Sequence, residues 1–147
     1  MCINRDANDE QKYVVKLEEY KNNSENDAEV ANKIQGAINE VIVNVALSEL
    51  AGGENVVRCF GAYLSTERVF IVQEYMENGC LLDFVKKKNR CEEVYCKYIL
   101  YNITRALRFI HSKGVLHRDL KSANVLVGSQ GELKVCDFGL SRKTRND

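Results

Sequence analysis

Apolar residues follow a helical period in three stretches of the chain. The longest stretch, 92–113, carries one apolar face and ends at Gly114, a residue type that suits a helix terminus. Its apolar residues are Ile99, Ile103, Ala106, Leu107 and Ile110. A second helix is predicted between the polar capping segment 22–27 and the Gly52-Gly53 pair. Its apolar residues are Val30, Ile34, Ile38, Val41 and Val45. A third, short helix is predicted for 81–88.

Strand-like runs are short and rich in β-branched and aromatic residues. Residues 13–17, 56–60 and 69–72 predict three strands, of which the last two are joined by 61–68. Together with the helix that lies between the first two, they predict a small antiparallel sheet with one helix. Residues 1–12 are polar and charged without any period, so we expect a disordered or weakly ordered start there.

Two further β-runs flank a turn near the end of the chain. Residues 125–127 and 133–135 surround the sequence GSQG at 128–131, and this pattern predicts a hairpin. Because the strands of a hairpin run side by side, Asn124 before the first strand should lie across from Asp137 after the second. The hairpin is therefore expected to bring an amide and a carboxylate together.

Further charged groups lie beside this amide and carboxylate. Asp119 precedes Asn124 by only five residues, in a loop that mixes both signs of charge. Two carboxylates and an amide are hard oxygen ligands, which Mg²⁺ prefers when it is shared with a phosphorylated substrate. Lys121 adds a positive charge next to them. The pattern indicates a surface cleft that handles a metal ion and phosphate.

Composition places the chain among ordinary globular proteins. Its 147 residues suffice for one domain, 45% are apolar, 29% are charged and the formal net charge is zero. Without a basic run we expect neither nucleic acid nor an anionic membrane as a partner. No apolar stretch is long enough to span a bilayer, and we expect a cytoplasmic protein.

Cysteine usage argues against a metal site built on sulfur. The six cysteines are Cys2, Cys59, Cys80, Cys91, Cys96 and Cys136. No two of them form a Cys-x-x-Cys pair, and only two histidines accompany them, so the ligand spacing of a zinc site is missing. We expect free thiols in a reducing compartment.

The polar segment around the hairpin resembles a known family. Residues 117–124, HRDLKSAN, followed by DFG at 137–139, resemble the catalytic loop and the magnesium loop of protein kinases. The resemblance implies a role for each polar residue. Asp119 would orient and deprotonate the acceptor hydroxyl, Lys121 would contact the γ-phosphate, and Asn124 and Asp137 would hold Mg²⁺. His117 and Phe138 are expected to pack rather than to react.

Two residues upstream resemble the lysine–glutamate pair of the same family. Lys16 lies near the end of a strand similar to V-A-I-K, so it would contact the α- and β-phosphates of ATP. Glu40 lies in the second predicted helix and would pair with Lys16. The alternatives are an exposed strand lysine and a surface glutamate, or a different register. Asn44, one turn after Glu40, stands where the family usually places an apolar residue.

Residues 73–80 resemble the segment that links the two lobes of a kinase and binds adenine. By position, the Glu74 carbonyl and the Met76 amide would bond the base, and Gln73 would line the back of the pocket. Cys80 lies near the expected ribose site. It is either a reactive thiol at a helix start or an inert free thiol.

The resemblance implies an α+β, partly bilobal fold. Residues 13–72 would form part of the N-lobe, 73–80 the hinge, and 81–147 part of the C-lobe, ending in the activation segment. The implied activity is transfer of the ATP γ-phosphate to protein hydroxyls, with Mg²⁺. The Lys-Ser pair after Asp119 and the sequence DFGLS are similar to serine/threonine kinases of the tyrosine-kinase-like branch. The protein substrate and the oligomeric state stay open.

Two family signatures are missing from the 147 residues. A Gly-rich loop does not precede Lys16, and no A-P-E motif follows Gly139. We therefore expect little or no kinase activity from this chain alone, with apolar surface left uncovered on 92–113 and on the hairpin. The alternative is a non-catalytic, kinase-like binding or regulatory module. A small-molecule kinase is disfavoured because Lys121 is of the protein-kinase type.

Overall fold

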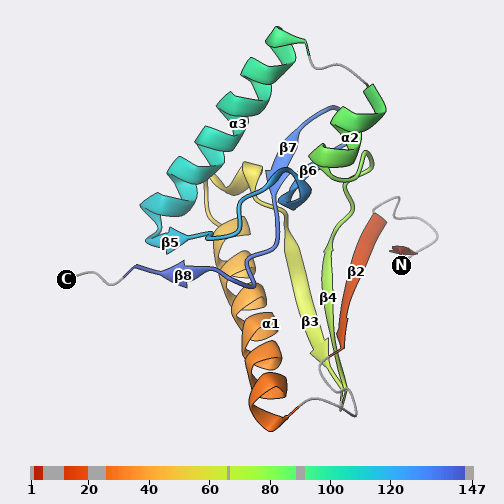
Figure 1. The fold of residues 1–147 in the computed structure, drawn as a ribbon, viewed down its shortest axis with the longest axis vertical. Helices are drawn as coiled ribbons and strands as arrows, with labels where there is room; N and C mark the ends of the chain where they lie inside the picture. The colour runs from red at the N-terminus through yellow and green to blue at the C-terminus, as the bar shows by residue number, and fades with distance from the viewer. Residues whose placement is uncertain (1, 5–11, 20–25, 66, 89–91, 145–147) are drawn as a thin grey trace.

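The computed structural model describes residues 2–4, 12–19, 26–65, 67–88 and 92–144. Four strands form one antiparallel sheet in the order β1-β2-β4-β3, and helix α1 lies alongside it (Figure 1). These strands are β1 Cys2–Asn4, β2 Lys12–Glu19, β3 Cys59–Leu64 and β4 Arg68–Glu74. The remaining helices and short strands form a second part above the end of α1. The predicted α+β class is confirmed.

Helix α1 spans Asp27–Ser48 and is defined at both ends by local sequence. Asn26 and Glu29 form a capping box, in which each side chain accepts a bond from the other residue's backbone N–H. The helix ends before Gly52, whose φ of 97° requires a residue without a Cβ. The predicted second helix is confirmed.

The sheet face that α1 covers is apolar along β4. Val69 and Ile71 alternate with half-buried residues and pack with Ala37 and Cys59. Val30, Ile34, Val41 and Val45 of α1 close over this cluster, as the helical period predicted. The next residue on the same face of β4 is Gln73, which is 7% exposed.

The second part of the molecule is built on α3 and the hairpin. Helix α2 spans Leu81–Lys88, α3 spans Glu93–Ser112, and Gly114 follows α3 with a φ of 67°. Strands β6, Val125–Val127, and β7, Leu133–Val135, are antiparallel with Val125 opposite Val135. The short strands β5, Val115–Leu116, and β8, Arg142–Lys143, pair nearby. Both predicted helices and the predicted hairpin are confirmed.

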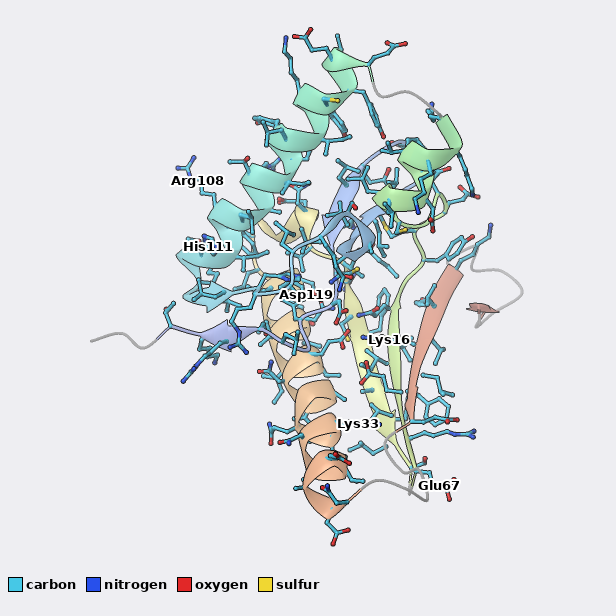
Figure 2. The ribbon with its side chains drawn as sticks, viewed as in Figure 1. Lys16, Lys33, Glu67, Arg108, His111 and Asp119 are labelled. Carbon is cyan, nitrogen blue, oxygen red and sulfur yellow. The ribbon has the colours of Figure 1, made fainter. Side chains whose placement is uncertain are left out.

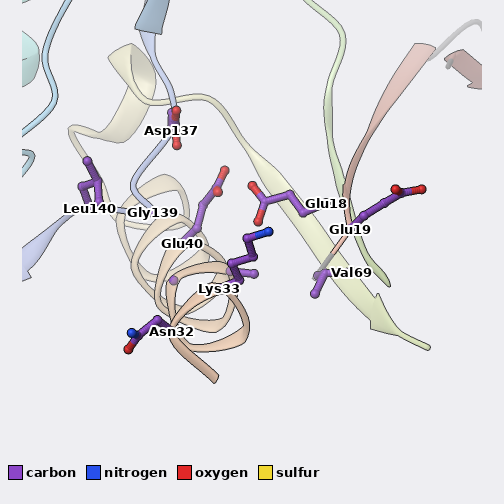
Figure 3. A pocket seen from close by; sticks show the side chains of 11 residues that line it. Glu18, Glu19, Asn32, Lys33, Glu40, Val69, Asp137, Gly139 and Leu140 are labelled. Atoms are coloured by element: carbon purple, nitrogen blue, oxygen red, sulfur yellow. The ribbon is translucent and has the colours of Figure 1, made fainter. Parts of the chain in front are cut away.

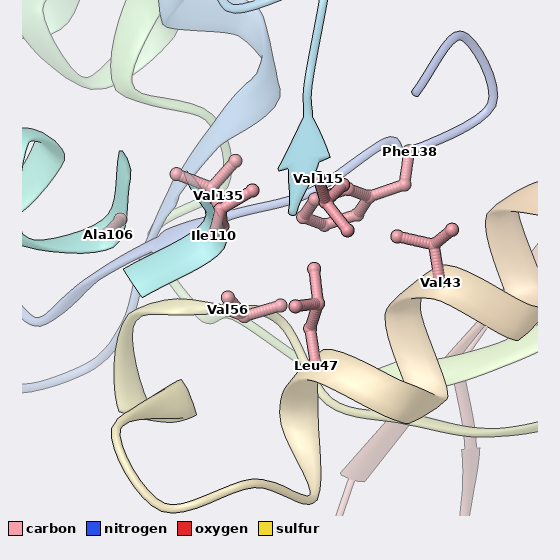
Figure 4. Close-up of a cluster of buried hydrophobic side chains, with 8 residues drawn as sticks. All are labelled: Val43, Leu47, Val56, Ala106, Ile110, Val115, Val135 and Phe138. Carbon is pink, nitrogen blue, oxygen red and sulfur yellow. The ribbon is translucent and has the colours of Figure 1, made fainter. Parts of the chain in front are cut away.

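Phe138 joins the two parts. Its ring is 0% exposed and lies between Val43 and Leu47 of α1 and Ile110 of α3 (Figure 4). Val56, Ala106, Val115 and Val135 complete this cluster. Burying a phenylalanine side chain stabilises a fold by about 1.5–3 kcal/mol, so Phe138 fixes the segment after the hairpin against both helices.

The predicted strand 56–60 is wrong in its position. Strand β3 begins at Cys59 and runs to Leu64, through residues expected to form a connection. Val56 and Val57 leave the sheet because they pair with β7, where the Val57 N–H donates to the Val135 carbonyl at 2.9 Å. Their β-branched side chains are buried, which suits a strand and a buried crossing segment equally well.

The predicted disordered or weakly ordered start is wrong for residues 2–4, which form β1, and for Lys12, which opens β2. Its other residues, 1 and 5–11, lie outside the described residues. The expectation of uncovered apolar surface is met in part. The outer face of α3 is indeed uncovered, with Val94 76% and Leu100 66% exposed. The hairpin is not, because its side chains Val125, Val127, Leu133 and Val135 are all 2% exposed or less.

In the described ranges, no helix is long and apolar enough to cross a membrane.

Candidate active site

The hairpin brings Asn124 and Asp137 to one place. The Cys136 N–H donates to the Asn124 carbonyl at 3.0 Å, which extends the ladder one residue beyond the Val125–Val135 pair. Asp137 is the next residue along the chain. The juxtaposition predicted from the hairpin pattern is therefore present.

Asp119 is held on the other side of Asn124. The Asn124 Nδ2 donates to the Asp119 carbonyl at 2.9 Å and to Asp119 Oδ2 at 3.0 Å. Lys121 Nζ donates to the same Oδ2 at 2.7 Å. The Lys121 hydrogen bond is the main cause that lowers the pKa of Asp119 below its ordinary value, and Asn124 adds to it. In the described contacts only Oδ2 of the Asp119 carboxylate is bonded, so Oδ1 can accept a hydrogen bond from another group.

His117 fixes the loop to the hairpin. Its ring is 2% exposed, its Nδ1 accepts from the Asp119 N–H at 3.3 Å, and its Nε2 lies 3.0 Å from the Cys136 carbonyl. This pattern requires the tautomer that carries its proton on Nε2. The ring also packs on Phe138, with centroids 4.9 Å apart. These contacts favour packing over chemistry for His117, in line with the prediction.

The backbone is strained at two residues of the site. Arg118 and Asp137 both have a φ of 66°, in the left-handed region, which costs a non-glycine residue about 1–2 kcal/mol. Arg118 Nε donates to the Leu140 carbonyl at 2.6 Å, so this side chain ties the loop to the segment after Asp137. Such conformations persist where the surrounding contacts over-determine them.

Lys16 reaches the site from β2. Its Nζ lies 2.8 Å from Glu40 Oε2 and 3.5 Å from Asp137 Oδ1. Figure 2 shows Lys16 and Asp119 near the middle of the molecule. The lysine and glutamate predicted upstream are thus in contact with each other and with the hairpin end, which supports the strand and helix register proposed for them.

Burial and charge oppose each other in this pair. Burial lowers the pKa of Lys16, but the Glu40 charge and the bonds to Glu18 and Glu40 outweigh it, so the net pKa is raised. Burial raises the pKa of Glu40, and the Lys16 ammonium works against that rise. Glu40 is 1% exposed, and within the described residues its Oε1 has no hydrogen-bond partner.

A cavity of about 530 Å³ opens beside this pair (Figure 3). Its charged lining residues are Glu18, Glu19, Lys33, Glu40 and Asp137. Lys16 Nζ contacts three of the four carboxylates, Glu18, Glu40 and Asp137. None of the residues 73–76, predicted to bind adenine, lines this cavity.

The predicted hinge has its own contacts. Both Glu74 carboxylate oxygens accept from Lys134 Nζ at 2.8 Å, and Glu74 Oε1 accepts from the Arg58 N–H at 2.7 Å. The Glu74 side chain therefore ties β4 to β7. Met76 is 6% exposed and its carbonyl accepts from the Gly79 N–H at 3.1 Å. Binding of adenine by the Glu74 carbonyl and the Met76 amide stays a prediction.

The cysteines near the site differ in chemistry. The half-buried Cys80 thiol donates to Asp83 Oδ2 at 3.2 Å, and its reactivity stays a prediction. Burial, with Asp137 and Glu40 adding, raises the pKa of Cys136 to about 12, so this thiol stays protonated. Across the described ranges, no group of three or more His, Cys, Asp or Glu residues has the arrangement of a metal cluster.

The residues present fit a magnesium ion that is shared with phosphate. Mg²⁺ is commonly held by one or two carboxylates plus substrate oxygens. In the described contacts, Asn124 Nδ2 donates to Asp119, so Asn124 Oδ1 is the side-chain atom that can bind a cation. Asp137 contacts Lys16 through Oδ1 only.

Two residues of the site were not predicted from the sequence. Glu18 Oε1 lies 2.8 Å from Lys16 Nζ. It stands two positions after Lys16, on the same face of the strand, and this alternation could have found it. Asn39 donates from α1 to the segment after Asp137, with partners about a hundred residues away in sequence. No local pattern signals such a contact.

Comparisons with known proteins agree with this geometry. The family model described as the protein kinase domain matches residues 1–147. The chain is similar to CBL-interacting protein kinase 31 of Oryza sativa subsp. japonica, with 36% identity over 130 residues, which cover 83% of this chain and 29% of that protein. It is also similar to Mitogen-activated protein kinase 14 of Arabidopsis thaliana, with 39% identity over 94 residues, or 60% of this chain and 26% of that protein.

The relatives also limit how far the match extends. Mitogen-activated protein kinase 1 of Oryza sativa subsp. japonica is 45% identical over 76 residues, which cover 52% of this chain and 19% of that protein. The chain thus spans less than a third of the length of these relatives. Their names do not support the tyrosine-kinase-like branch that the Lys-Ser pair and DFGLS suggested.

Proposed function

The chain belongs to the protein kinase family, and we propose that its site transfers the γ-phosphate of ATP to hydroxyl groups of proteins. The observation that carries the proposal is the convergence of three segments, which carry Lys16, the pair Asp119 and Asn124, and Asp137. Phosphoryl transfer needs mainly positioning and charge neutralisation, and these four side chains offer both.

The nucleotide is held from two directions in this proposal. Lys16, oriented by Glu40, contacts the α- and β-phosphates, while the Glu74 carbonyl and the Met76 amide bond the adenine. Cys80 lies at the ribose side. Asn124 Oδ1 and the Asp137 carboxylate hold Mg²⁺, which supplies neutralisation of the charge on the phosphate oxygens when bound.

The acceptor hydroxyl is handled by the catalytic loop. Asp119 Oδ1 accepts a hydrogen bond from the hydroxyl and takes its proton, because Oδ2 is already held by Lys121 and Asn124. Lys121 contacts the γ-phosphate with its Nζ. A carboxylate is ionised at neutral pH, and the hydrogen bond from Lys121 lowers the pKa of Asp119 further below its ordinary value.

The finer assignments concern the acceptor residue, the branch of the family and the location of the protein. Serine/threonine specificity is supported by Lys121 in HRDLKSAN and by the kinases that the chain resembles. The tyrosine-kinase-like branch rests on the Lys-Ser pair and DFGLS alone, and the relatives do not favour it. We propose little or no transfer by these 147 residues alone, with a protein hydroxyl as the acceptor of any transfer. A cytoplasmic location remains a prediction from sequence.

Nucleotide binding tests the first half of the proposal. Titration of the 147-residue chain with ATP should show higher affinity with Mg²⁺ than without it. Asp137→Ala should remove this Mg²⁺-dependent gain while leaving binding of Mg²⁺-free ATP, which depends on Lys16. Binding that ignores both Mg²⁺ and Asp137→Ala would support the non-catalytic binding module instead.

Transfer of radiolabelled γ-phosphate to a basic protein substrate tests the second half. A positioned general base contributes about 10²- to 10⁴-fold to rate, so Asp119→Asn should lower the rate by that order. The variant keeps the bond from Lys121 and the fold of the loop. Transfer at an unchanged rate in Asp119→Asn would exclude the assigned role of Asp119.

A further inference from the structure

Helix α1 makes a second contact with the segment that follows Asp137, independent of Lys16. The Nδ2 of Asn39 lies 3.2 Å from the Phe138 carbonyl, 3.1 Å from the Ser141 carbonyl and 3.1 Å from Ser141 Oγ. The Ser141 N–H donates to the Phe138 carbonyl at 2.9 Å, so residues 138–141 form a turn closed by its own backbone bond. We call Asn39 together with this turn the clasp.

The clasp holds both ends of the turn with one amide. An NH₂ group has two hydrogens, so three acceptors share them. Ser141 is 6% exposed and Phe138 is 0% exposed, which means that water does not replace these bonds readily. The turn between the two residues is therefore fixed by a side chain of α1.

The Asp137 carboxylate lies close to the turn. A Cβ placed on Gly139 would lie 3.5 Å from Asp137 Oδ1 and 3.7 Å from Glu40 Oε2, so the carboxylate lies directly over the turn. Figure 3 shows Gly139 beside α1 on the segment that follows Asp137, with Leu140 farther along it. Asp137 itself has a φ of 66°, a conformation that neighbouring contacts must maintain.

We propose that Asn39 is a positioning residue, which acts through the clasp to hold the Asp137 carboxylate toward Lys16 and toward bound Mg²⁺. Asn39 and Glu40 are neighbours on α1, so one helical turn aligns both the metal-binding carboxylate and the phosphate-binding lysine. The part of this proposal that concerns Mg²⁺ rests on the proposed function. The part that concerns the turn does not.

Hydrogen exchange of the nucleotide-free chain tests the turn. Asn39→Ala should raise the exchange rate of the Ser141 amide about tenfold, since the bond to Phe138 loses its support. Ser141→Ala should give a smaller rise because the two backbone contacts of Asn39 remain. The matched control is Gln35→Ala, which removes an exposed amide from the same helix and should leave the turn unchanged.

ATP titration with and without Mg²⁺ tests the positioning role. Asn39→Ala should reduce the Mg²⁺-dependent gain in affinity about tenfold, while the affinity for Mg²⁺-free ATP stays within about twofold because Lys16 and Glu40 keep their contact. A merely structural residue would weaken both equally. Asn39→Asp keeps the shape of the side chain but loses both donor hydrogens, so it should show the same selective loss of the Mg²⁺-dependent gain. It replaces the alanine variant in this test if the alanine variant does not fold.

Each outcome decides a separate claim. Unchanged Ser141 exchange in both Asn39 variants overturns the clasp. Faster exchange with an intact Mg²⁺-dependent gain overturns the positioning role. If the unmodified chain shows no Mg²⁺-dependent gain at all, the proposed function fails, whereas the exchange result still decides the clasp on its own.

Discussion

The two sides of the site differ in how well their buried polar groups are satisfied. On the hairpin side, residues 115–141, His117 uses both ring nitrogens and Asn124 donates twice to Asp119. On the helix side, formed by α1 and the strands that it covers, Asn44 is 0% exposed and neither atom of its amide has a partner in the described ranges. Glu40 Oε1 and Gln73 Nε2 are likewise buried and have no hydrogen-bond partner among the described residues.

This difference affects how strongly each side of the site is stabilised. A buried polar group without a partner costs about 1–3 kcal/mol, so the packing of α1 on the sheet is opposed by its own polar groups. It is maintained by the apolar contacts of α1, by Lys16 with Glu40 and by the clasp of Asn39. The hairpin side, in contrast, is reinforced by its polar groups. The helix side is therefore the less strongly stabilised half of the site.

Phe138 is where the two sides meet, and removing its ring should have the largest effect. Phe138→Ala takes a fully buried ring from the cluster that contains Val43, Leu47 and Ile110. Loss of such a ring typically lowers the free energy of unfolding by about 3–5 kcal/mol. Urea denaturation followed by circular dichroism measures this loss.

The control for this change is Phe60→Ala. Phe60 is 38% exposed and contacts Tyr13 with ring centroids 4.9 Å apart, so its loss should cost only about 1 kcal/mol. Equal losses for the two variants would mean that Phe138 does not join the two sides as the structure indicates.

The sequence alone predicts the hairpin side better than the helix side. β6, β7 and the Asn124–Asp137 juxtaposition follow from alternation and a four-residue turn, which are local signals. The boundary of β3 could not be predicted, because Val56 and Val57 carry strand propensity but pair with Val135, far away in sequence. Local propensity does not distinguish a sheet strand from a buried crossing segment.

The same limit applies to the site. Lys16 and Glu40 were found through a family resemblance, and Glu18 follows Lys16 at a spacing that strand alternation provides. Asn39 could not be predicted, since its partners at Phe138 and Ser141 are set only when the whole chain has folded. A polar residue in a helix has no sequence signature for a distant backbone acceptor.

Asn44→Leu tests the cost of the unsatisfied amide directly. Leucine is of similar size and needs no hydrogen bond, so the free energy of unfolding should rise by about 1–3 kcal/mol. Asn102→Leu is the matched control on α3. Asn102 is 8% exposed, but its Nδ2 donates to the Tyr98 carbonyl at 2.9 Å and its Oδ1 accepts from Asn55. This control should be destabilised, and a gain in both variants would remove the contrast.

Cysteine alkylation shows whether the gain from Asn44→Leu is local to α1. Cys59 is 4% exposed beneath α1, and burial raises its pKa, whereas Cys136 on the hairpin side has a pKa raised to about 12. Slower opening of α1 should reduce alkylation of Cys59 by about 5- to 100-fold, following the 1–3 kcal/mol gain. Cys136 should change less. Equal slowing at both thiols would place the gain in the whole fold instead.

Lys121→Met should have the smallest effect on the fold. Besides the contact with the γ-phosphate proposed above, it removes the bond that Lys121 makes to Asp119 on the hairpin side. Asp119 has a pKa below its ordinary value of 3.8, mainly because Lys121 bonds it, so the methionine variant should show a pKa closer to that value. A carboxylate with a lowered pKa contributes stability above its unfolded pKa and loses it as pH falls through the folded value. The variant should therefore lose part of this acid-dependent stability, which NMR titration of the Asp119 carboxyl carbon and unfolding at low pH both measure.

Lys97→Met, which breaks the exposed Lys97–Glu93 pair, is the control that should leave the Asp119 pKa alone. An unchanged Asp119 titration in Lys121→Met would mean that Asn124 alone holds this carboxylate, and the hairpin side would then be reinforced by fewer contacts than the structure indicates.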